Sequence, residues 1–425
     1  MKLWDKGISI DKKIEKFTVG NDREIDLYIA KYDVNASLAH AQMLKKIEIL
    51  SAEELQQLET GLQTLADQIA DGTFIIEPEF EDVHSKIEFE LTKRYGDVGK
   101  KIHTARSRND QVLVALQLFY KDSLNSIFEK TESLFNTLLD LAETHKNSLL
   151  PGYTHLQVAM PSSFGLWFSA YAETLIDDVY LLKAAMRTVD QNPLGSAAGY
   201  GSSFKIDRSY TTDKMGFSTL KYNVVAAQMA RGKSERTIAL ALGSLCNTMA
   251  RFAMDVCLYN SQNFGFISFP DELTTGSSIM PHKKNPDVFE LIRGKANKIQ
   301  ALHTEIVLIT NNLPSGYHRD FQLLKAPMIS AIEDVKNILD IFNYAIQKSE
   351  IAQIDLSDAK YQYLFTVDNI NTLVEGGMSF REAYQKIGSE VQNGTYEADT
   401  SKQHTHLGSM GNLCLEEIRA KFPKI

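Results

Sequence analysis

The sequence predicts an all-α protein in which several long helices lie between turns marked by proline and glycine. Residues 110–150 contain neither proline nor glycine, and residues 162–192 contain only Gly165. Apolar residues in these stretches follow helical spacing, and strand-like alternation is scarce along the whole chain. Because helices of this length must bury an apolar face against partners, the pattern predicts a bundle of long helices with smaller helical segments at each end.

Composition is that of a globular protein and argues against several classes of function. The 425 residues are 44% hydrophobic and 23% charged, and the length suggests two or three domains. A net charge of −9 argues against a general nucleic-acid binder, although it is compatible with a local cationic pocket. Three scattered cysteines, Cys246, Cys257 and Cys414, indicate neither a disulfide framework nor a zinc site.

No targeting or membrane segment is expected. The N-terminal stretch MKLWDKGISIDKK lacks the apolar core of a signal peptide. We identify no run that is long and apolar enough to span a bilayer. These absences predict a cytoplasmic protein.

The first region, residues 1–105, has the signals of several short helices. Ser51 precedes two glutamates and has the pattern of a helix N-cap, with leucines following at helical spacing. A second helical pattern opens at residues 81–85, EDVHS. Taken alone, His84 in this segment is more often a capping or core histidine than a functional one.

Residues 100–111 lead from a loop into the first long helix. Arg106, Arg108 and Asn109 stand at that junction, where guanidinium and amide groups can hold carboxylates through bidentate hydrogen bonds. The alternative is a solvated basic patch. The helix that follows is expected to end at Pro151–Gly152.

A histidine then lies in the turn between two long helices. The segment 151–161 reads PGYTHLQVAMP, with Thr154 and His155 at its centre. A histidine suits proton transfer near neutral pH, but alone it would more often be structural. The Gly-rich segment 193–203 is expected to be a loop, and residues 218–264 a helix with weak points at Gly232 and Gly243.

The stretch 274–290, TTGSSIMPHKKNPDVFE, combines a flexible serine loop with a cationic segment before a helix. Asn285 is a preferred N-cap, Pro286 suits the first helical position and Asp287 suits the first turn. A helix N-terminus favours anions, so the segment predicts an anion site. The alternative is a polar loop that only caps a surface helix.

Two further polar segments follow. Residues 317–325, YHRDFQLLK, would by themselves be an ordinary polar turn into a helix. Beyond about residue 350 the helical patterns become shorter, and Ser379 resembles an N-cap. The pair His404 and His406 lacks further ligands nearby in the sequence, so we expect no metal site.

Several of these segments resemble one family. GSSIMPHKKNP at 276–286 is similar to the GSSxMPxKxNP signature of the fumarase/aspartase superfamily, lyases that release fumarate. Within it, residues 104–111, TARSRNDQ, resemble the TGRSRNDQ segment of argininosuccinate lyases, with Ala105 in place of glycine. PGYTHLQ, EDVHS and the Y-x-x-D-x-Q-x-x-K pattern at 317–325 also resemble that family.

The resemblance implies an architecture that periodicity alone does not. It implies three helical domains, at residues 1–105, 106–350 and 351–425. It also implies a homotetramer whose core is a bundle of the long central helices, with each active site shared between three subunits. No cofactor, metal, nucleic acid or membrane is implied.

The implied reaction is the β-elimination of argininosuccinate to L-arginine and fumarate, the last step of arginine biosynthesis. By family position, Ser277 is the base, Lys283 and Asn285 hold the carboxylate that gains charge, and His155 is on the acid side with Thr154 beside it. Glu290 is placed to orient His155. The implied substrate-binding residues are Ser107, Arg108, Asn109, Tyr317, Gln322, Lys325 and His84, of which Tyr317, Gln322 and Lys325 hold the amino-acid end.

Two positions depart from the family pattern and keep alternatives open. Asp22 stands where members often have a substrate-contacting serine, so residues 21–23 are left out of the predicted site. His282 stands where argininosuccinate lyases often have glutamine, whereas M-P-H-K also occurs in adenylosuccinate lyases. Adenylosuccinate lyase or another fumarate-releasing lyase is therefore one alternative. A non-catalytic, crystallin-like structural protein is a more remote one.

Overall fold

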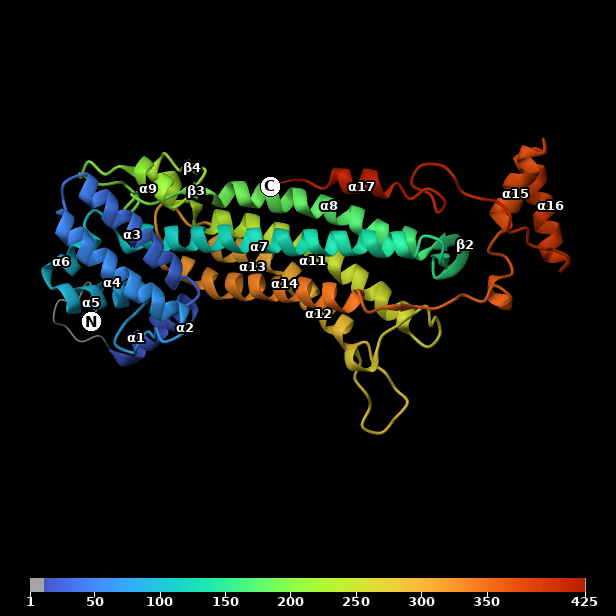
Figure 1. Cartoon of the computed structure of the whole chain (residues 1–425), viewed down its shortest axis with the longest axis horizontal. Coiled ribbons are helices and arrows are strands. Elements are labelled where there is room, and N and C mark those ends of the chain that lie inside the picture. The colour runs from blue at the N-terminus through green and yellow to red at the C-terminus, as the bar shows by residue number, and fades with distance from the viewer. Residues whose placement is uncertain (1–10, 425) are drawn as a thin grey trace. The chain divides into compact units, whose positions relative to one another are not determined.

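The computed structural model describes residues 11–424 and is built mainly of helices (Figure 1). Residues 1–10, where no targeting segment was expected, lie outside the described residues. The α-helices are α1 Lys12–Val19, α2 Asp22–Asp26, α3 Ala30–Lys46, α4 Ala52–Ala70, α5 Val83–Tyr95, α6 Asp97–Lys100, α7 Arg108–Thr144, α8 Phe164–Val189, α9 Arg208–Lys214, α10 Val224–Gln228, α11 Ala230–Asn260, α12 Asp287–Gln300, α13 Leu302–Thr310, α14 Lys325–Ile346, α15 Thr366–Glu375, α16 Phe380–Gln392 and α17 Leu415–Lys421. Short 3-10 turns include η1 Lys101–His103 and η3 Arg319–Leu324. The all-α prediction is confirmed.

The chain divides into two compact units, and four long helices, α7, α8, α11 and α14, each contribute residues to both. Unit 1 contains Met1–Phe128, Leu181–Ser244 and Lys298–Lys336, and unit 2 contains Glu129–Tyr180, Leu245–Asn297 and Asn337–Ile425. The three-domain division remains a prediction.

Unit 1 packs the N-terminal helices α3, α4 and α5 on one another and holds the first half of α7 against α11. Gln117 of α7 donates a 2.9 Å hydrogen bond to Ser234 of α11, and both residues are buried. Leu44 of α3 and Leu58 of α4 have no exposed surface. The predicted N-cap at Ser51 is confirmed, since Ser51 and Glu54 form a capping box at the start of α4.

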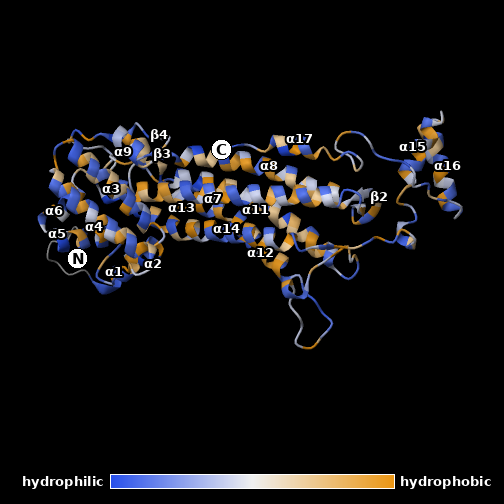
Figure 2. Ribbon diagram, in the orientation of Figure 1, coloured by the Kyte–Doolittle hydropathy of each residue, from blue (hydrophilic) through white to orange (hydrophobic). Residues whose placement is uncertain are grey.

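Unit 2 packs its long helices around a cluster of aromatic side chains. Tyr171 of α8 stacks on Phe252 of α11 with ring centroids 4.0 Å apart, and Phe252 contacts Phe342 of α14. Asp255 of α11 accepts hydrogen bonds from Trp167 and from Tyr171 of α8. Figure 2 shows that hydrophobic and hydrophilic residues alternate around these helices, as expected for elements that bury one side.

The helix predicted to reach Pro151 ends earlier, at Thr144, and an antiparallel hairpin follows it. Its strands are β1 Leu149–Thr154 and β2 Gln157–Ser163. Proline disfavours helical angles in the residue before it, so Leu150 is extended and pairs with Ser162. Shorter pairs join β3 Gln191–Asn192 to β4 Thr219–Leu220 and β5 Ile267–Ser268 to β6 Glu350–Ile351.

Helix α11 is broken at Gly232, one of the two glycines predicted to be weak points. Arg231 and Gly232 have non-helical angles, with φ of +79° at Gly232, whereas the helix runs unbroken through Gly243. The backbone N–H of Gly232 donates to Glu235 at 2.7 Å, so the helix restarts with a capping carboxylate. By length and composition, α11 is long and apolar enough to cross a membrane, contrary to the expectation above. Because 61% of its most apolar window is buried inside the structure, it has the burial of a core helix.

The start of α12 differs in detail from the prediction. The helix begins at Asp287, and the carbonyl of Pro286 accepts the first bonds, from Phe289 and Glu290. Asn285 does not cap the helix with its side chain but directs its amide back toward Thr275 and Gly276. The reason is that residues 275 and 285 pair as an isolated β-bridge, which closes the intervening loop.

The C-terminal helices α15 and α16 form a small cluster of their own around Ile370, Ala383 and Ile387. Ser379 caps α16 through a capping box with Glu382, as its sequence predicted. His404 lies 2.9 Å from Asp368 and forms an ion pair when protonated.

We expect Gly232→Ala to lower the free energy of unfolding by about 2 to 5 kcal/mol, because a left-handed angle is unfavourable for alanine and a Cβ here overpacks the core. The added Cβ would lie 2.6 Å from Cγ2 of Thr310. Gly243→Ala in the same helix is the matched control, since its Cβ meets only one atom within 4 Å, at 3.9 Å. That variant should gain up to about 1 kcal/mol. Urea titrations of both variants test this, and equal effects would contradict the prediction.

Candidate functional site

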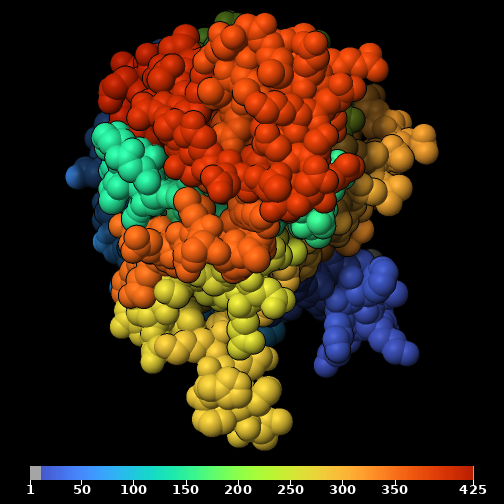
Figure 3. Space-filling view, turned by 90° about the vertical axis from the view of Figure 1, so that its right-hand side faces the viewer, coloured from blue at the N-terminus to red at the C-terminus, as the bar shows by residue number. Residues whose placement is uncertain are grey.

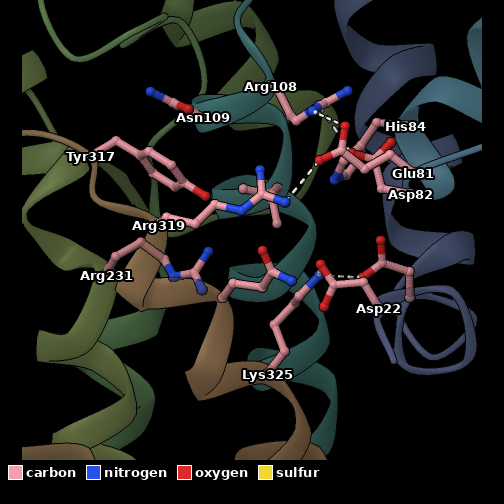
Figure 4. A pocket seen from close by; sticks show the side chains of 13 residues that line it. Asp22, Glu81, Asp82, His84, Arg108, Asn109, Arg231, Tyr317, Arg319 and Lys325 are labelled. Atoms are coloured by element: carbon pink, nitrogen blue, oxygen red, sulfur yellow. Dashed lines mark hydrogen bonds and ion pairs between the residues drawn. The ribbon is translucent and has the colours of Figure 1, made fainter. Parts of the chain in front are cut away.

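A polar cavity lies in unit 1, where segments far apart in the sequence meet (Figure 4). Its volume is about 40 Å³, room for only a few water molecules. The lining is supplied by six segments: helix α2, the start of α5, the start of α7, the break in α11, turn η3 and the start of α14. The lining residues are Asp22, Asp26, Glu81, Asp82, His84, Arg108, Asn109, Val112, Arg231, Tyr317, Arg319, Gln322 and Lys325.

Capping residues at the starts of α5 and α7 fix the positions of several of these side chains. Asp82 caps α5 by accepting a 2.8 Å bond from the backbone of Ser85, which fixes the first turn that carries His84. At the start of α7, Asp110 accepts a bond from the backbone N–H of Ser107, and the Ser107 hydroxyl accepts one from Asn109. Arg108 and Asn109 are therefore held on the first turn of α7, and Ser107 acts beside the cavity as a capping residue.

Carboxylates already pair with the arginines at one end of the cavity. Arg108 lies 3.2 Å from Glu81 and 2.9 Å from Asp82, and Arg319 lies 2.9 Å from Glu81 (Figure 4). Burial favours the neutral form of Asp82, but His84 and Arg108 lower its pKa below the usual value. These cations can exchange internal partners for the carboxylates of a ligand. At 50% exposure, Arg319 is the most accessible of the paired residues.

His84 is buried and held by a second carboxylate outside the cavity. Its Nδ1 lies 2.8 Å from Asp33, which also accepts a bond from Gln111. Burial lowers the pKa of His84, but the nearby carboxylates of Asp33, Asp82 and Asp26 raise it by more. The net pKa of His84 is therefore above its usual value. Within residues 11–424, Nε2 of His84 is buried without a hydrogen-bond partner. A protonated His84 can therefore donate this N–H to a ligand that enters the cavity.

Lys325 lies at the other end of the cavity between two carboxylates. Its Nζ is 2.6 Å from Asp26 and 2.9 Å from Asp22. The two carboxylates outweigh burial and raise the pKa of Lys325, so it stays protonated. Burial raises the pKa of Asp22, Lys325 lowers it and the nearby Asp26 raises it, which together bring the pKa to about 6. Gln322 donates its amide to the carbonyls of Thr18 and Val19.

The cavity gathers most of the predicted substrate-binding residues. Six of them line it: His84, Arg108, Asn109, Tyr317, Gln322 and Lys325. Ser107 lies next to it, as described above. Six other lining residues with polar chemistry were missed: Asp22, Asp26, Glu81, Asp82, Arg231 and Arg319. Glu81 and Asp82 stand next to His84 in the EDVHS segment, a signal that could have identified them.

Thr154 and His155 lie at the tip of the β1–β2 hairpin in unit 2 and are exposed. Thr154 pairs with Gln157, which leaves a two-residue turn with φ of +55° at His155 and +58° at Leu156. Left-handed angles are unfavourable for leucine, so this turn stores backbone strain of the kind that collects at functional sites. His155 also lines a second cavity with Tyr153, Trp167, Tyr171, Arg251 and Asp255, among others. No residue of 274–290 is in that lining.

The loop 276–284 in unit 2 projects from the helices of its own unit (Figures 1 and 3). Ser277 accepts weak hydrogen bonds from the backbone of Ile279 and Met280. Lys283 is exposed, and Lys284 forms an ion pair with Asp271. Glu290 is exposed and lies 3.9 Å from Arg293. The predicted orientation of His155 by Glu290 remains a prediction.

No group of three or more His, Cys, Asp or Glu side chains in residues 11–424 could hold a metal ion. The unit 1 cavity instead has the polar side chains of a site for a small molecule that carries both positive and negative groups. Arginine and lysine can bind carboxylates, and aspartates can bind an ammonium or guanidinium group.

A family model described as Lyase matches residues 7–301. The argininosuccinate lyase of Bacteroides thetaiotaomicron is 53% identical over 424 residues, which are 100% of this chain and 95% of that protein. Among solved structures, the class II fumarase of Schistosoma mansoni has a TM-score of 0.74 at 16% identity, covering 89% of this chain and 88% of the other. EDDS lyase in complex with formate has a TM-score of 0.72 at 21% identity, covering 91% and 78%. These two structures support the fold.

Asp22→Asn should stabilise the protein at pH 8 and have little effect near pH 4. The raised pKa means that the contribution of Asp22 to stability is present below 3.8 and is lost as the pH rises through about 6. The difference between these values corresponds to at most about 3 kcal/mol. Asparagine does not ionise, so the variant does not lose this stability as the pH rises.

Unfolding free energies of wild type and variant, measured in parallel from pH 4 to pH 8, test the prediction. Glu24→Gln, which removes an exposed carboxylate of the same short helix, is the control. A stability difference between wild type and Asp22→Asn that does not change with pH would contradict it.

Proposed function

The chain belongs to the argininosuccinate lyase family, and we propose from this premise that it cleaves argininosuccinate to L-arginine and fumarate by β-elimination. The observation that carries the proposal is the charge pattern of the unit 1 cavity. It presents Arg108 and Asn109 from one helix start, and Tyr317, Gln322 and Lys325 from another junction. A substrate with carboxylates at one end and an amino-acid group at the other matches this pattern.

In the proposed reaction, a base removes the Cβ proton of the succinyl part, and the adjacent carboxylate takes up negative charge as an aci-carboxylate. The C–N bond then breaks, and an acid protonates the departing guanidinium nitrogen. Ser277 is the proposed base and His155, with Thr154, the proposed acid side. Serine is a weak base, so it requires a cationic, water-excluding surrounding such as loop 276–284 could form on closing.

Lys283 and Asn285 are the proposed ligands of the carboxylate that accumulates charge, and Glu290 the residue that orients His155. The exposure of Lys283 supports this role, because its ammonium group is free of ion pairs within residues 11–424 and available to an anion. The helix that begins at Asp287 adds a partial positive charge beside it.

The proposed active form is a homotetramer with sites shared between three subunits. The proposed acid and base both stand on exposed projections of unit 2, the hairpin tip and the loop, whereas the charged cavity belongs to unit 1. Exposed catalytic groups need a covering surface to exclude water. We further propose a cytoplasmic enzyme that needs no cofactor and binds neither nucleic acid nor membrane.

Adenylosuccinate is the second candidate substrate, because His282 is exposed in the loop beside Lys283 and matches the M-P-H-K form. Purified protein should release fumarate from argininosuccinate, seen as ultraviolet absorbance, and none from adenylosuccinate in a parallel cuvette. Release from adenylosuccinate alone would overturn the proposed substrate. Absence of release from both would favour a structural, crystallin-like role.

Ser277→Ala and His155→Ala should each abolish turnover without changing fold or oligomeric state. After subunit exchange between the two variants, about a quarter of the sites should hold both intact residues and regain activity, since these residues come from different chains in the proposed symmetric assembly. Activity and exchange are measured on the same mixture. Verified exchange without recovery would contradict shared sites, and substantial activity of Ser277→Ala alone would contradict its role as base.

A further inference from the structure

Asp22 is an unusual residue for the place it occupies. The family pattern has a serine at this position, but here a carboxylate lines the cavity and is only 14% exposed. Its Oδ2 pairs with Lys325 at 2.9 Å. Among residues 11–424, Lys325 is the one ion-pair partner of Asp22. Asp22 therefore has acceptor capacity left for a ligand.

The charges at this end of the cavity do not balance. Lys325 is the one cation within 4.0 Å of both Asp22 and Asp26 among the described residues. The other cations of the lining have partners elsewhere: Arg108 and Arg319 pair with Glu81, Arg231 pairs with Glu235, and the protonated His84 pairs with Asp33. Two carboxylates thus share one ammonium group, and a second cation would restore neutrality. Burial raises the pKa of Asp22, and the neighbouring carboxylate of Asp26 raises it as well.

The hydrogen-bonding groups nearby also suit a donor with several N–H bonds. Gln322 uses its amide N–H groups on the carbonyls of Thr18 and Val19, which leaves its oxygen as an acceptor. The Tyr317 hydroxyl, which also lines the cavity, is another acceptor. Lys325 has three N–H donors and uses two, so the third remains for a carboxylate. Together these groups match an α-ammonium next to an α-carboxylate.

We propose that Asp22 is a specificity-determining residue that binds the free α-ammonium group of the amino-acid end of the substrate. This inference rests on the proposed function, because argininosuccinate carries such a group on its arginine part. A substrate whose α-amino group is missing or acylated leaves Asp22 and Asp26 with a single ammonium group, that of Lys325, between them. The site therefore selects against such compounds.

The test compares argininosuccinate with its analogue in which hydrogen replaces the α-amino group. Wild-type protein should prefer argininosuccinate by about 10- to 100-fold in kcat/KM, the worth of a hydrogen bond to a charged group. Asp22→Ser, which restores the family residue, and Asp22→Asn, which keeps the shape, should lose most of this preference. The loss should come from argininosuccinate, mainly as a higher KM, while the analogue is unaffected.

Two controls separate this role from a structural one. Glu24→Gln removes an exposed carboxylate from the same helix and should keep the wild-type preference. Calorimetric titration with L-arginine and with arginine lacking its α-amino group gives a readout that does not depend on turnover. The Asp22 variants should weaken binding of L-arginine and leave that of the analogue unchanged.

Equal losses for both substrates would overturn the inference, because Asp22 would then act only by holding Lys325 or by binding the guanidinium group. An unchanged preference in folded Asp22 variants would overturn it too. Failure of the wild-type protein to cleave argininosuccinate would overturn the proposed function first and this inference with it. Turnover by wild type with no discrimination against the analogue would overturn the inference alone.

Discussion

The pairing of Lys325 with Asp26 joins residues 299 positions apart in the sequence, and the cavity depends on it. It holds the short helix α2 against the first turn of α14, which brings Asp22 and Gln322 to the same end of the cavity. The same carboxylate of Asp26 accepts a bond from the backbone of Val83, one residue before His84. One buried carboxylate therefore fixes three of the segments that line the site.

Buried charges of this kind seldom stabilise a protein in proportion to their number. Removing them from water costs several kcal/mol each, and only good geometry and further hydrogen bonds repay that cost. For Asp33, Asp82 and His84 this cost is offset, since each lies against an oppositely charged or donor group. Asp22 shares its one cationic partner, Lys325, with Asp26, and burial raises the pKa of its carboxyl to about 6. Such local instability is common where a protein must bind a charged ligand, because the ligand supplies the missing partner.

The helices were largely predictable from the sequence because their apolar spacing and caps are local signals. The capping boxes at Ser51 and Ser379 and the break at Gly232 follow from residues within one turn. The hairpin at Thr154 was not predictable in the same way, since its strands are short and contain two prolines, Pro151 and Pro161. The turn at Asn285 was misjudged because a β-bridge ten residues back competes for its amide.

Of the residues that line the cavity, only those that belong to recognisable motifs were predicted. His84, Arg108 and Lys325 stand in recognisable segments, whereas Asp26 and Arg231 stand in segments without a motif and become visible only when the chain folds. Asp22 was set aside because it departs from the family pattern. A departure from the pattern is not by itself a loss of function, because a serine-to-aspartate change inside a cavity adds a full negative charge next to Lys325. A departure of that size in a charged site is better treated as evidence about the ligand, since a buried carboxylate persists only where something compensates it.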